Sequence, residues 1–268
     1  MQQRPARPYR GDFVAWNGGG MFIGSGAGVV APHAHYAIQL VLGAPSGLRV
    51  QFGRNGEWQP CAAALLPSRA THSIDVFDCE WTAVLFVEPE TPAGRALTAR
   101  LQGSMESLDP DEVAVVARRL ERAWRIERDG DAVGAICRQW LRELSQAASA
   151  EPSDARILAA IAAIRERPDE AVTLAQLAAA AHLSPGRFRH LFVEQTGMPL
   201  RTYLLWRRLL HVWTFLMQGE TLSHAAHAAG FADSAHLART ARTMFGLPPS
   251  ALQANGPLAE RLRDTRVH

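Results

Sequence analysis

The feature that most constrains this chain is a two-helix unit that occurs twice in its C-terminal half. Each copy begins at a threonine, Thr173 or Thr221, that can cap a short alanine-rich helix. A turn follows, and then a second helix that ends at a glycine, Gly197 or Gly246. Small and apolar residues recur at equivalent places in the two short helices: Leu174, Leu177 and Ala178, then Leu222, Ala225 and Ala226. Such residues let two helices cross closely, which predicts two helix-turn-helix motifs, each able to place its second helix in the major groove of DNA.

The segment between the copies, residues 199–217, is largely apolar and predicts one long linker helix. It contains Tyr203-Leu204-x-x-x-Arg208-Leu209, and Gly230-Phe231 follows in the turn of the second copy. With these motifs and Gly246-x-Pro248-Pro249, residues 155–253 resemble the DNA-binding domain of the AraC family of bacterial transcription regulators. The departures from the family pattern are His190 in place of an arginine, Ala241 in place of a phenylalanine, and Gly197-Met-Pro199, which is one residue short.

The outward face of each second helix is where the resemblance places contacts with DNA. Phe188, Leu191 and Phe192 face the core of the first copy, and Leu237 and Phe245 that of the second. The candidate DNA-binding residues are Gly186, Arg187, Arg189, His190, Ser234, Ala235, Ala238, Arg239 and Arg242.

Arginine suits such a face because its planar fork pairs with guanine or with a phosphate. We expect Arg189 and Arg239 to carry most of the specificity, because the glycine and alanines offer only close approach or methyl contact. For Arg187 and Arg242, a solvent-exposed or phosphate-contacting role is favoured over base reading. The charge distribution permits this function: residues 154–268 hold 13 arginines and 9 acidic residues, a net charge of +4.

The N-terminal half has a different period. From residue 13 to residue 87, short alternating runs are broken by turn clusters such as 43–47 and 53–56, which predicts strands of a barrel or sandwich. From Asp109 the pattern is helical, with amphipathic stretches at 113–128 and 132–144. The predicted fold class is therefore α+β, with a β-barrel over residues 1–106, a helical connector over 107–150 and an all-α domain over 154–255 that carries both helix-turn-helix motifs.

All three histidines of residues 1–153 fall in one pattern: His33-x-His35-x-x-x-Gln39, and later His72. If residues 33–39 form one strand, the side chains of 33, 35 and 39 share a face. The pattern resembles the metal motif of the cupin barrel, with Gln39 in place of the usual acid and Arg69 in place of a glycine. The resemblance implies a cupin-like sensor domain with an effector site at His33, His35, Gln39 and His72.

Three alternatives stay open for this site. His33, His35 and His72 could bind zinc or another first-row divalent metal, leaving one position free. In sensor domains of the AraC family the same positions often line a pocket for an organic effector without a metal. They could also be a relic without function. The glutamine lowers the expected affinity for metal, because neutral ligands leave the charge of the ion uncompensated.

Two functions from different classes follow. The first is a regulator that binds double-stranded DNA, responds to a small molecule or metal, and contacts RNA polymerase if it activates. The second is a metal-dependent cupin enzyme, an oxygenase or isomerase, with a helical appendage. The tandem motif favours the first, with no catalytic residues.

Assembly and location are predicted from the same sequence. Residues 113–124 and 133–144 carry apolar stripes at helical spacing, which could bury a dimer interface or belong to the core of one chain. We also expect the signal to cross residues 109–150, because they connect the two domains in sequence. No apolar stretch approaches the length of about 18 residues that a membrane span needs, which predicts a cytoplasmic protein without membrane contact.

Overall fold

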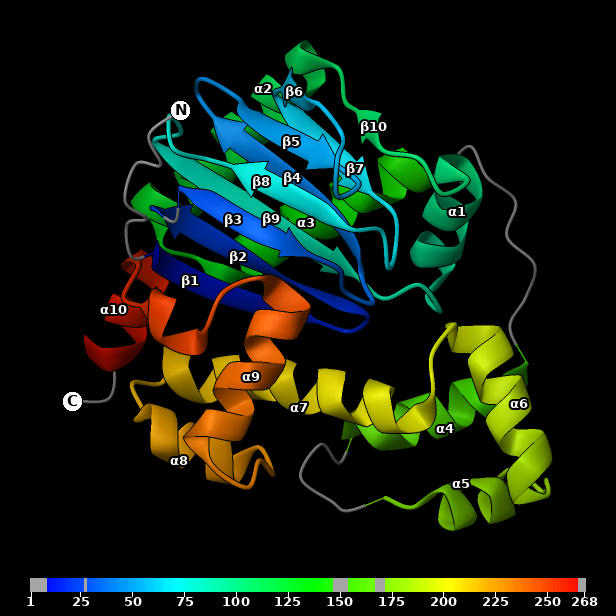
Figure 1. The fold of residues 1–268 in the computed structure, drawn as a ribbon. Helices are drawn as coiled ribbons and strands as arrows, with labels where there is room; N and C mark the ends of the chain where they lie inside the picture. The colour runs from blue at the N-terminus through cyan, green and yellow to red at the C-terminus, as the bar shows by residue number, and fades with distance from the viewer. Residues whose placement is uncertain (1–8, 27, 147–153, 167–171, 265–268) are drawn as a thin grey trace.

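The computed structural model describes residues 9–26, 28–146, 154–166 and 172–264 (Figure 1). Its N-terminal half consists of two β-sheets. The larger sheet has the order β10-β7-β4-β9-β2-β1-β11 and the smaller one β3-β8-β5-β6. The strands are β1 Tyr9–Trp16, β2 Gly19–Ser25, β3 Val29–His33, β4 Ile38–Ala44, β5 Leu48–Phe52, β6 Trp58–Cys61, β7 Ala63–Leu66, β8 His72–Asp75, β9 Trp81–Val87, β10 Glu106–Ser107 and β11 Leu252–Ala254.

The remaining elements are helical. They are α1 Pro92–Leu101, α2 Pro110–Glu121, a π-helix Arg122–Glu127, α3 Gly130–Ser145, α4 Ala155–Glu166, α5 Leu174–Ala180, α6 Pro185–Thr196, α7 Leu200–Met217, α8 Leu222–Ala228, α9 Ser234–Phe245, a 3₁₀ turn Pro249–Ala251 and α10 Pro257–Asp264. This arrangement confirms the predicted fold class, with strands first and paired helices after them. Within the described ranges, no helix has the length and apolarity to cross a membrane.

The prediction that His33 and Gln39 lie on one strand is wrong. The chain leaves the smaller sheet after His33, at the end of β3, and enters the larger sheet at Ile38, so residues 34–37 bridge the two sheets. The register of β3 against β8 shifts between Val30 and His33. Pro32 lies in this stretch, and a proline has no N–H to donate to the neighbouring strand. The prediction that the chain is helical throughout from Asp109 is also wrong, because β11 pairs in parallel with β1.

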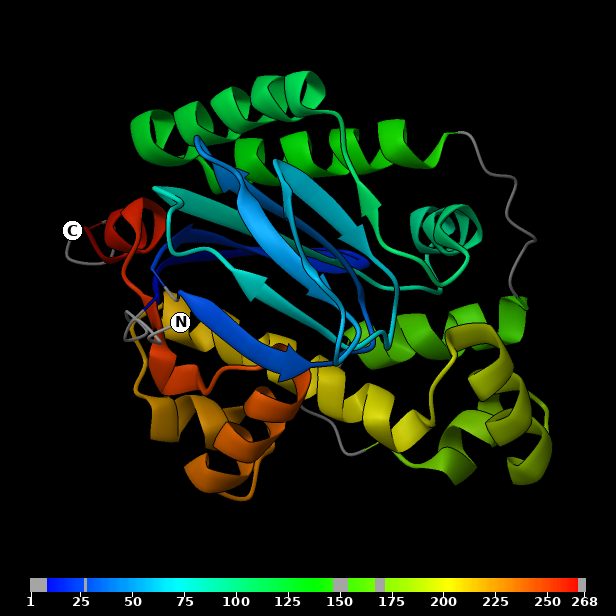
Figure 2. The same ribbon diagram turned by 45° about the horizontal axis from the view of Figure 1, so that its top comes forward.

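Helices α2 and α3 lie along one side of the sheets, and the helices from α4 to α9 lie on the other (Figure 2). Both predicted apolar stripes face the sheets. The buried members are Val113, Val116, Leu120, Ala123, Trp124, Val133, Trp140, Leu141 and Leu144. They close the core of the N-terminal half.

Aromatic residues join the sheets directly to the C-terminal helices. Phe22 of β2 lies 4.7 Å from Trp213 of α7 and 5.7 Å from Phe245 of α9, measured between ring centroids. Phe86 of β9 contacts the same Phe245 at 5.1 Å and Trp206 of α7 at 5.9 Å. The two halves therefore touch through a packed interface, and a signal need not follow the connecting helices as the sequence suggested.

A buried ionic network lies beside these rings. Glu88, just after β9, is fully buried and accepts hydrogen bonds from Arg207 of α7 at 2.8 Å and from Arg165 of α4. Glu90 accepts from Arg165 at 3.1 Å and from Tyr203 of α7 at 3.0 Å. Every partner named here belongs to the C-terminal helices, so the two carboxyl groups hold them against the sheets.

The two carboxyl groups titrate differently. Burial alone would raise the pKa of Glu88, but the adjacent guanidinium groups of Arg207 and Arg165 outweigh it and lower that pKa. Burial raises the pKa of Glu90 to about 7, and the negative charge of Glu88 adds to the rise. Glu88 is thus the charged partner of the arginines, and Glu90 is largely protonated below neutral pH.

We predict that Glu88→Gln and Glu90→Gln differ sharply in stability at pH 6. Glu88→Gln leaves two partly buried guanidinium groups without their counter-charge and should cost about 3 kcal/mol, the low end for a broken buried pair because the arginines keep some solvent contact. Glu90→Gln replaces a carboxyl that is mostly neutral at this pH and should cost less than about 1 kcal/mol. Urea unfolding of the full chain measures both, and equal losses would contradict the assignment of charge.

The same pair predicts a dependence on pH. Because the folded-state pKa of Glu90 is raised, the folded chain holds this proton more tightly than the unfolded chain does. The contribution of Glu90 to the free energy of unfolding is then fully present below its unfolded pKa and is lost as pH rises towards about 7. Glu90→Gln should flatten this part of the profile relative to the unmodified chain.

Candidate functional site

The three histidines converge, although they come from different elements. His33 ends β3 and pairs in register with His72, which begins β8. His35 lies between β3 and β4, and Gln39 lies in β4. All three rings are buried, and one ring nitrogen from each lies within 4.8 Å of the others. The sequence thus identified a real cluster, through a strand geometry that the structure does not have.

Backbone carbonyls fix the orientation of each ring. The Nδ1 atoms of His33, His35 and His72 lie 2.9, 2.8 and 2.9 Å from the carbonyl oxygens of Ala31, Ala37 and Ala70. Because a carbonyl oxygen can only accept, Nδ1 is the protonated nitrogen in each neutral ring and Nε2 keeps a lone pair. This is the arrangement of histidines that ligate a metal through Nε2.

The histidines stay neutral over a wide range of pH. Burial lowers the pKa of all three, and the neighbouring imidazoles add to the effect at His35 and His72. The resulting pKa is about 4 for His35 and about 2 for His72. Neutral imidazole is the form that binds a divalent metal, so the cluster needs no deprotonation near neutral pH.

Gln39 gives the cluster its fourth polar group. Its Oε1 lies 2.5 Å from Nε2 of His35 and 3.3 Å from Nε2 of His72, and its buried Nε2 has no hydrogen-bond partner. An oxygen facing two ring lone pairs is satisfied in one of two ways. A cation can lie among the four atoms, or the amide can be rotated so that its NH₂ group donates to both rings. The donor set therefore fits zinc and equally fits a polar wall of an organic pocket.

A small apolar cavity of about 70 Å³ adjoins the cluster. His33 and Gln39 form its polar wall, and most of the rest is aliphatic or aromatic. Phe245 and Leu247, at the end of α9 and just after it, close this cavity from the side of the C-terminal domain. An occupant of the cavity would touch both halves of the chain.

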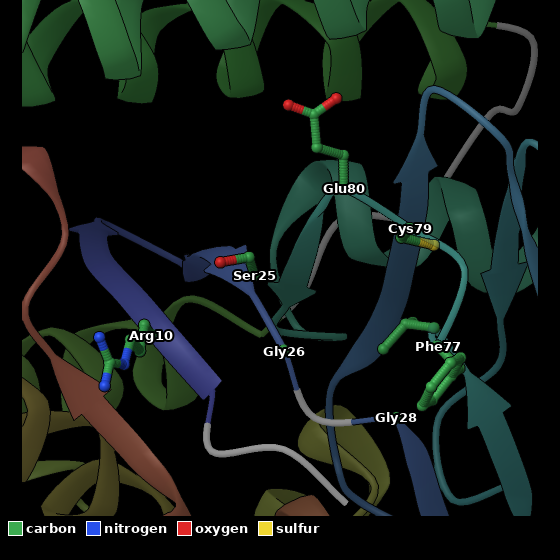
Figure 3. A pocket seen from close by; sticks show the side chains of 8 residues that line it. Arg10, Ser25, Gly26, Gly28, Phe77, Cys79 and Glu80 are labelled. Atoms are coloured by element: carbon green, nitrogen blue, oxygen red, sulfur yellow. The ribbon is translucent and has the colours of Figure 1, made fainter. Parts of the chain in front are cut away.

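A larger open pocket, of about 510 Å³, lies where β1, β2 and the loop after β8 meet (Figure 3). Arg10 and Glu80 stand on different sides of its opening, and Cys79 also lines it. It shares only Val76 with the smaller cavity and contains none of the predicted site residues. Of the predicted effector residues, His33 and Gln39 line the smaller cavity, and His35 and His72 lie beside it in the histidine cluster.

Both helix-turn-helix units form as the sequence predicted. Thr173 and Thr221 cap the short helices α5 and α8, and Ser184 and Asp233 cap the second helices α6 and α9. Asp233 accepts from the backbone N–H of His236 at 2.6 Å, which lowers the pKa of its carboxyl.

The predicted DNA-contacting residues lie on the outer faces of α6 and α9. All are exposed except Ala238, which is half-buried. The inward residues Phe188, Phe192 and Leu237 are fully buried, as expected. Phe245 also faces inward, but its ring contacts the sheets. Ala241 is buried at the position where the AraC-type pattern has a phenylalanine.

Sequence reasoning missed the ionic network of Glu88, Glu90, Arg165 and Arg207. One signal was available, because Glu88-Pro-Glu90 follows directly on the apolar run of β9. Acidic residues next to a buried strand are rarely buried themselves unless they are paired with an opposite charge. The partners lie far away in sequence, and no local pattern identifies them.

Comparisons with known proteins agree with this geometry. Residues 177–255 match the family described as a helix-turn-helix domain. The crystal structure of ToxT from Vibrio cholerae O395 has a TM-score of 0.55 at 10% identity, covering 88% of this chain and 96% of that one. Wild-type ToxT from Vibrio cholerae strain SCE256 with a bound unsaturated fatty acid has a TM-score of 0.52 at 10% identity, covering 92% and 95%. ToxT from strain O395 bound to (E)-4-(8-methylnaphthalen-1-yl)but-3-enoic acid has a TM-score of 0.53 at 9% identity, covering 91% and 97%.

Comparison with curated proteins finds no significant match. The similarity to ToxT is therefore one of fold and extends over both halves of the chain. Residues 177–255 form a helix-turn-helix domain of the AraC type, and the chain is a DNA-binding transcription regulator with the two-domain fold of ToxT.

Proposed function

We propose that this regulator responds to a small effector held by His33, His35, Gln39 and His72. The observation that carries the proposal is the shared wall of the cavity, which the sensor builds with His33 and Gln39 and the DNA-binding domain closes with Phe245. A cavity of about 70 Å³ admits only a few heavy atoms. A larger effector must displace Phe245, and with it the end of α9.

The chemistry of the site favours two kinds of effector. A divalent metal such as zinc would take three imidazole nitrogens and the amide oxygen of Gln39. A small organic molecule with an apolar body would fill the aromatic side of the cavity and meet the polar wall with its head group. The fatty acid and the naphthyl acid bound by ToxT support the organic alternative.

On DNA, we assign base contacts chiefly to Arg189 and Arg239. Arg187 and Arg242 contact phosphates, and His190 and Ser234 add polar contacts of lower selectivity. Gly186, Ala235 and Ala238 permit close approach of the helix to the groove. We expect the two DNA subsites, one for each second helix, to lie about 10 bp apart on one face of the duplex, because the single linker helix α7 joins the two motifs.

We assign no catalytic role to any residue, and RNA polymerase is a further partner if the regulator activates. The helix-turn-helix domain supports both assignments. The chain would thus act by changing its occupancy or its geometry on double-stranded DNA.

Arg239→Ala and Arg242→Ala should weaken DNA binding in different ways. Arg239→Ala should cost about 1–3 kcal/mol on an operator selected by the unmodified protein, and relax preference at one base pair. Arg242→Ala should weaken specific and random DNA alike and reduce the slope of log affinity against log salt by about 1. Fluorescence anisotropy at several salt concentrations measures both, with the exposed barrel variant Arg54→Ala as control. Equal loss on random DNA for Arg239→Ala would show a phosphate contact only.

Gln39→Glu should strengthen zinc binding by about tenfold, since an anionic ligand compensates the charge of the ion. His72→Ala should abolish stoichiometric binding, because it removes one of three imidazoles. Competition against a chromophoric chelator measures the affinity, and Gln59→Glu on the exposed face of β6 is the matched control. An unmodified protein that holds no zinc in this assay leaves the organic effector as the occupant of the site.

We further propose a homodimer through the outer face of the connector helices. Because the predicted stripes are buried against the sheets, the side chains available for a partner are Val115 of α2 and Ile126 of the π-helix, 49% and 76% exposed. Sedimentation at tens of micromolar should give a dimer mass, and the double variant Val115→Arg and Ile126→Arg should give a monomer. A strictly monomeric unmodified protein, with and without DNA, would remove this proposal.

A further inference from the structure

We propose that the sensor domain holds each DNA-reading helix by the glycine at its C-terminal end, with His33 and Arg69 as the positioning residues. The inference rests on the proposed function of the effector site, and it extends that function to the way in which the site reaches both readers. It is carried by two contacts at equivalent positions of the tandem repeat.

The first contact involves α9, the DNA-reading helix of the second helix-turn-helix motif. Gly246 ends α9 in the left-handed region, at φ 71°, and its N–H donates to the carbonyl oxygen of Arg242 at 3.0 Å. A Cβ atom at Gly246 would lie 2.8 Å from Nδ1 of His33 and 2.8 Å from a methyl group of Val30. The imidazole and the isopropyl group are held within the buried site, so they have little room to yield. The end of α9 therefore rests directly on one of the effector-site histidines.

The second contact involves α6, the DNA-reading helix of the first helix-turn-helix motif. Gly197 ends α6 in the same conformation, at φ 79°, and donates to the carbonyl oxygen of Val193 at 2.7 Å. A Cβ atom there would lie 2.7 Å from Nη2 of Arg69. The guanidinium thus stands at the C-terminal end of α6, where the helix dipole favours positive charge.

Arg69 belongs to the same site as His33. It lies in the loop before β8, three residues ahead of His72, and its backbone N–H donates to the carbonyl oxygen of His35 at 2.7 Å. Its φ of 62° is unusual for a residue with a side chain, so the loop is held in a defined conformation. A change at the histidine cluster would reach Arg69 through this hydrogen bond and through the loop.

The two contacts have the same relation to DNA. The candidate base-reading residues gather towards the exposed N-terminal parts of α6 and α9, whereas the C-terminal glycines face the sensor. The sensor therefore fixes the position of each helix without occupying its reading face. Because α9 rests on His33 and α6 on Arg69 of the adjoining loop, the sensor also fixes the distance between the two DNA subsites that the protein accepts.

Gly246→Ala and Arg69→Ala test these contacts one at a time. Gly246→Ala introduces a methyl group that cannot fit beside His33, and Arg69→Ala removes the group beside Gly197. Gly53→Ala is the matched control for the first, because Gly53 has φ 78° and no atom within 4 Å of its added Cβ. Arg54→Ala is the control for the second, as an exposed arginine of the same domain.

The readout is selectivity for the distance between subsites. We would measure the affinity of the full chain for its selected operator and for operators lengthened or shortened by two base pairs. The unmodified protein and both controls should prefer the selected spacing. Gly246→Ala and Arg69→Ala should each reduce that preference at least about fivefold, within the range of typical coupling between sites. As a folding control, we would use a DNA that keeps only the subsite bound by the helix whose contact was changed. The affinity of each variant for this DNA should stay within about twofold of that of the unmodified protein, whereas a misfolded helix-turn-helix motif would lose it.

Hydrogen exchange provides a measurement that needs no DNA. Amides at residues 243–247 should exchange faster in Gly246→Ala, and those at 194–198 faster in Arg69→Ala, with neither region changed in the controls. Unchanged exchange together with unchanged spacing preference would overturn the positioning role. Titration of the unmodified protein with zinc, or with increasing concentrations of oleate if no zinc binds, tests the proposed function separately. If the protein responds to neither, yet both variants lose their spacing preference, the positioning role is supported and the proposed effector site is contradicted.

Discussion

The arrangement of the two domains depends on the burial of one carboxylate, Glu88, between two arginines of the C-terminal helices. A charge without exposure to solvent is tolerated only where opposite charge and hydrogen bonds meet it. Arg165 and Arg207 come from α4 and α7, so the chain can satisfy Glu88 only when both helices lie against the end of β9. An apolar interface alone would tolerate sliding, whereas this network defines one register between sensor and reader.

The aromatic contacts act together with that network. Trp206 donates its indole N–H to Glu88 at 3.3 Å while its ring packs on Phe86, so one side chain serves both the ionic and the apolar part of the interface. The same rings lead to Phe245, which closes the sensor cavity. The proposed effector site and the domain interface are thus one continuous packed region, and a change in either changes the contacts of the other.

Local sequence signals were sufficient for the reader. Caps at Thr173 and Asp233 and the terminal glycines fix where each helix begins and ends, and these signals act within a few residues. The histidine site was found for a partly wrong reason, because His33 and His35 were placed on one strand. What brings them together is the passage of the chain between two sheets, and alternation along a strand cannot show such a passage.

The interface escaped prediction because its residues also satisfy simpler local patterns. Phe245 completes the apolar stripe of α9, so nothing marks it as a residue that packs on another domain. Gly246 is equally well explained as a helix cap, although the absence of a side chain there is needed twice, once for its φ and once for its contact with His33. When a local pattern already explains a residue type, the sequence gives no sign that a tertiary contact requires the same residue type. In a tandem repeat there is a second local explanation, because the repeat itself accounts for the recurrence of glycine at 197 and 246. The tertiary contacts of these glycines are therefore even harder to recognise from the sequence.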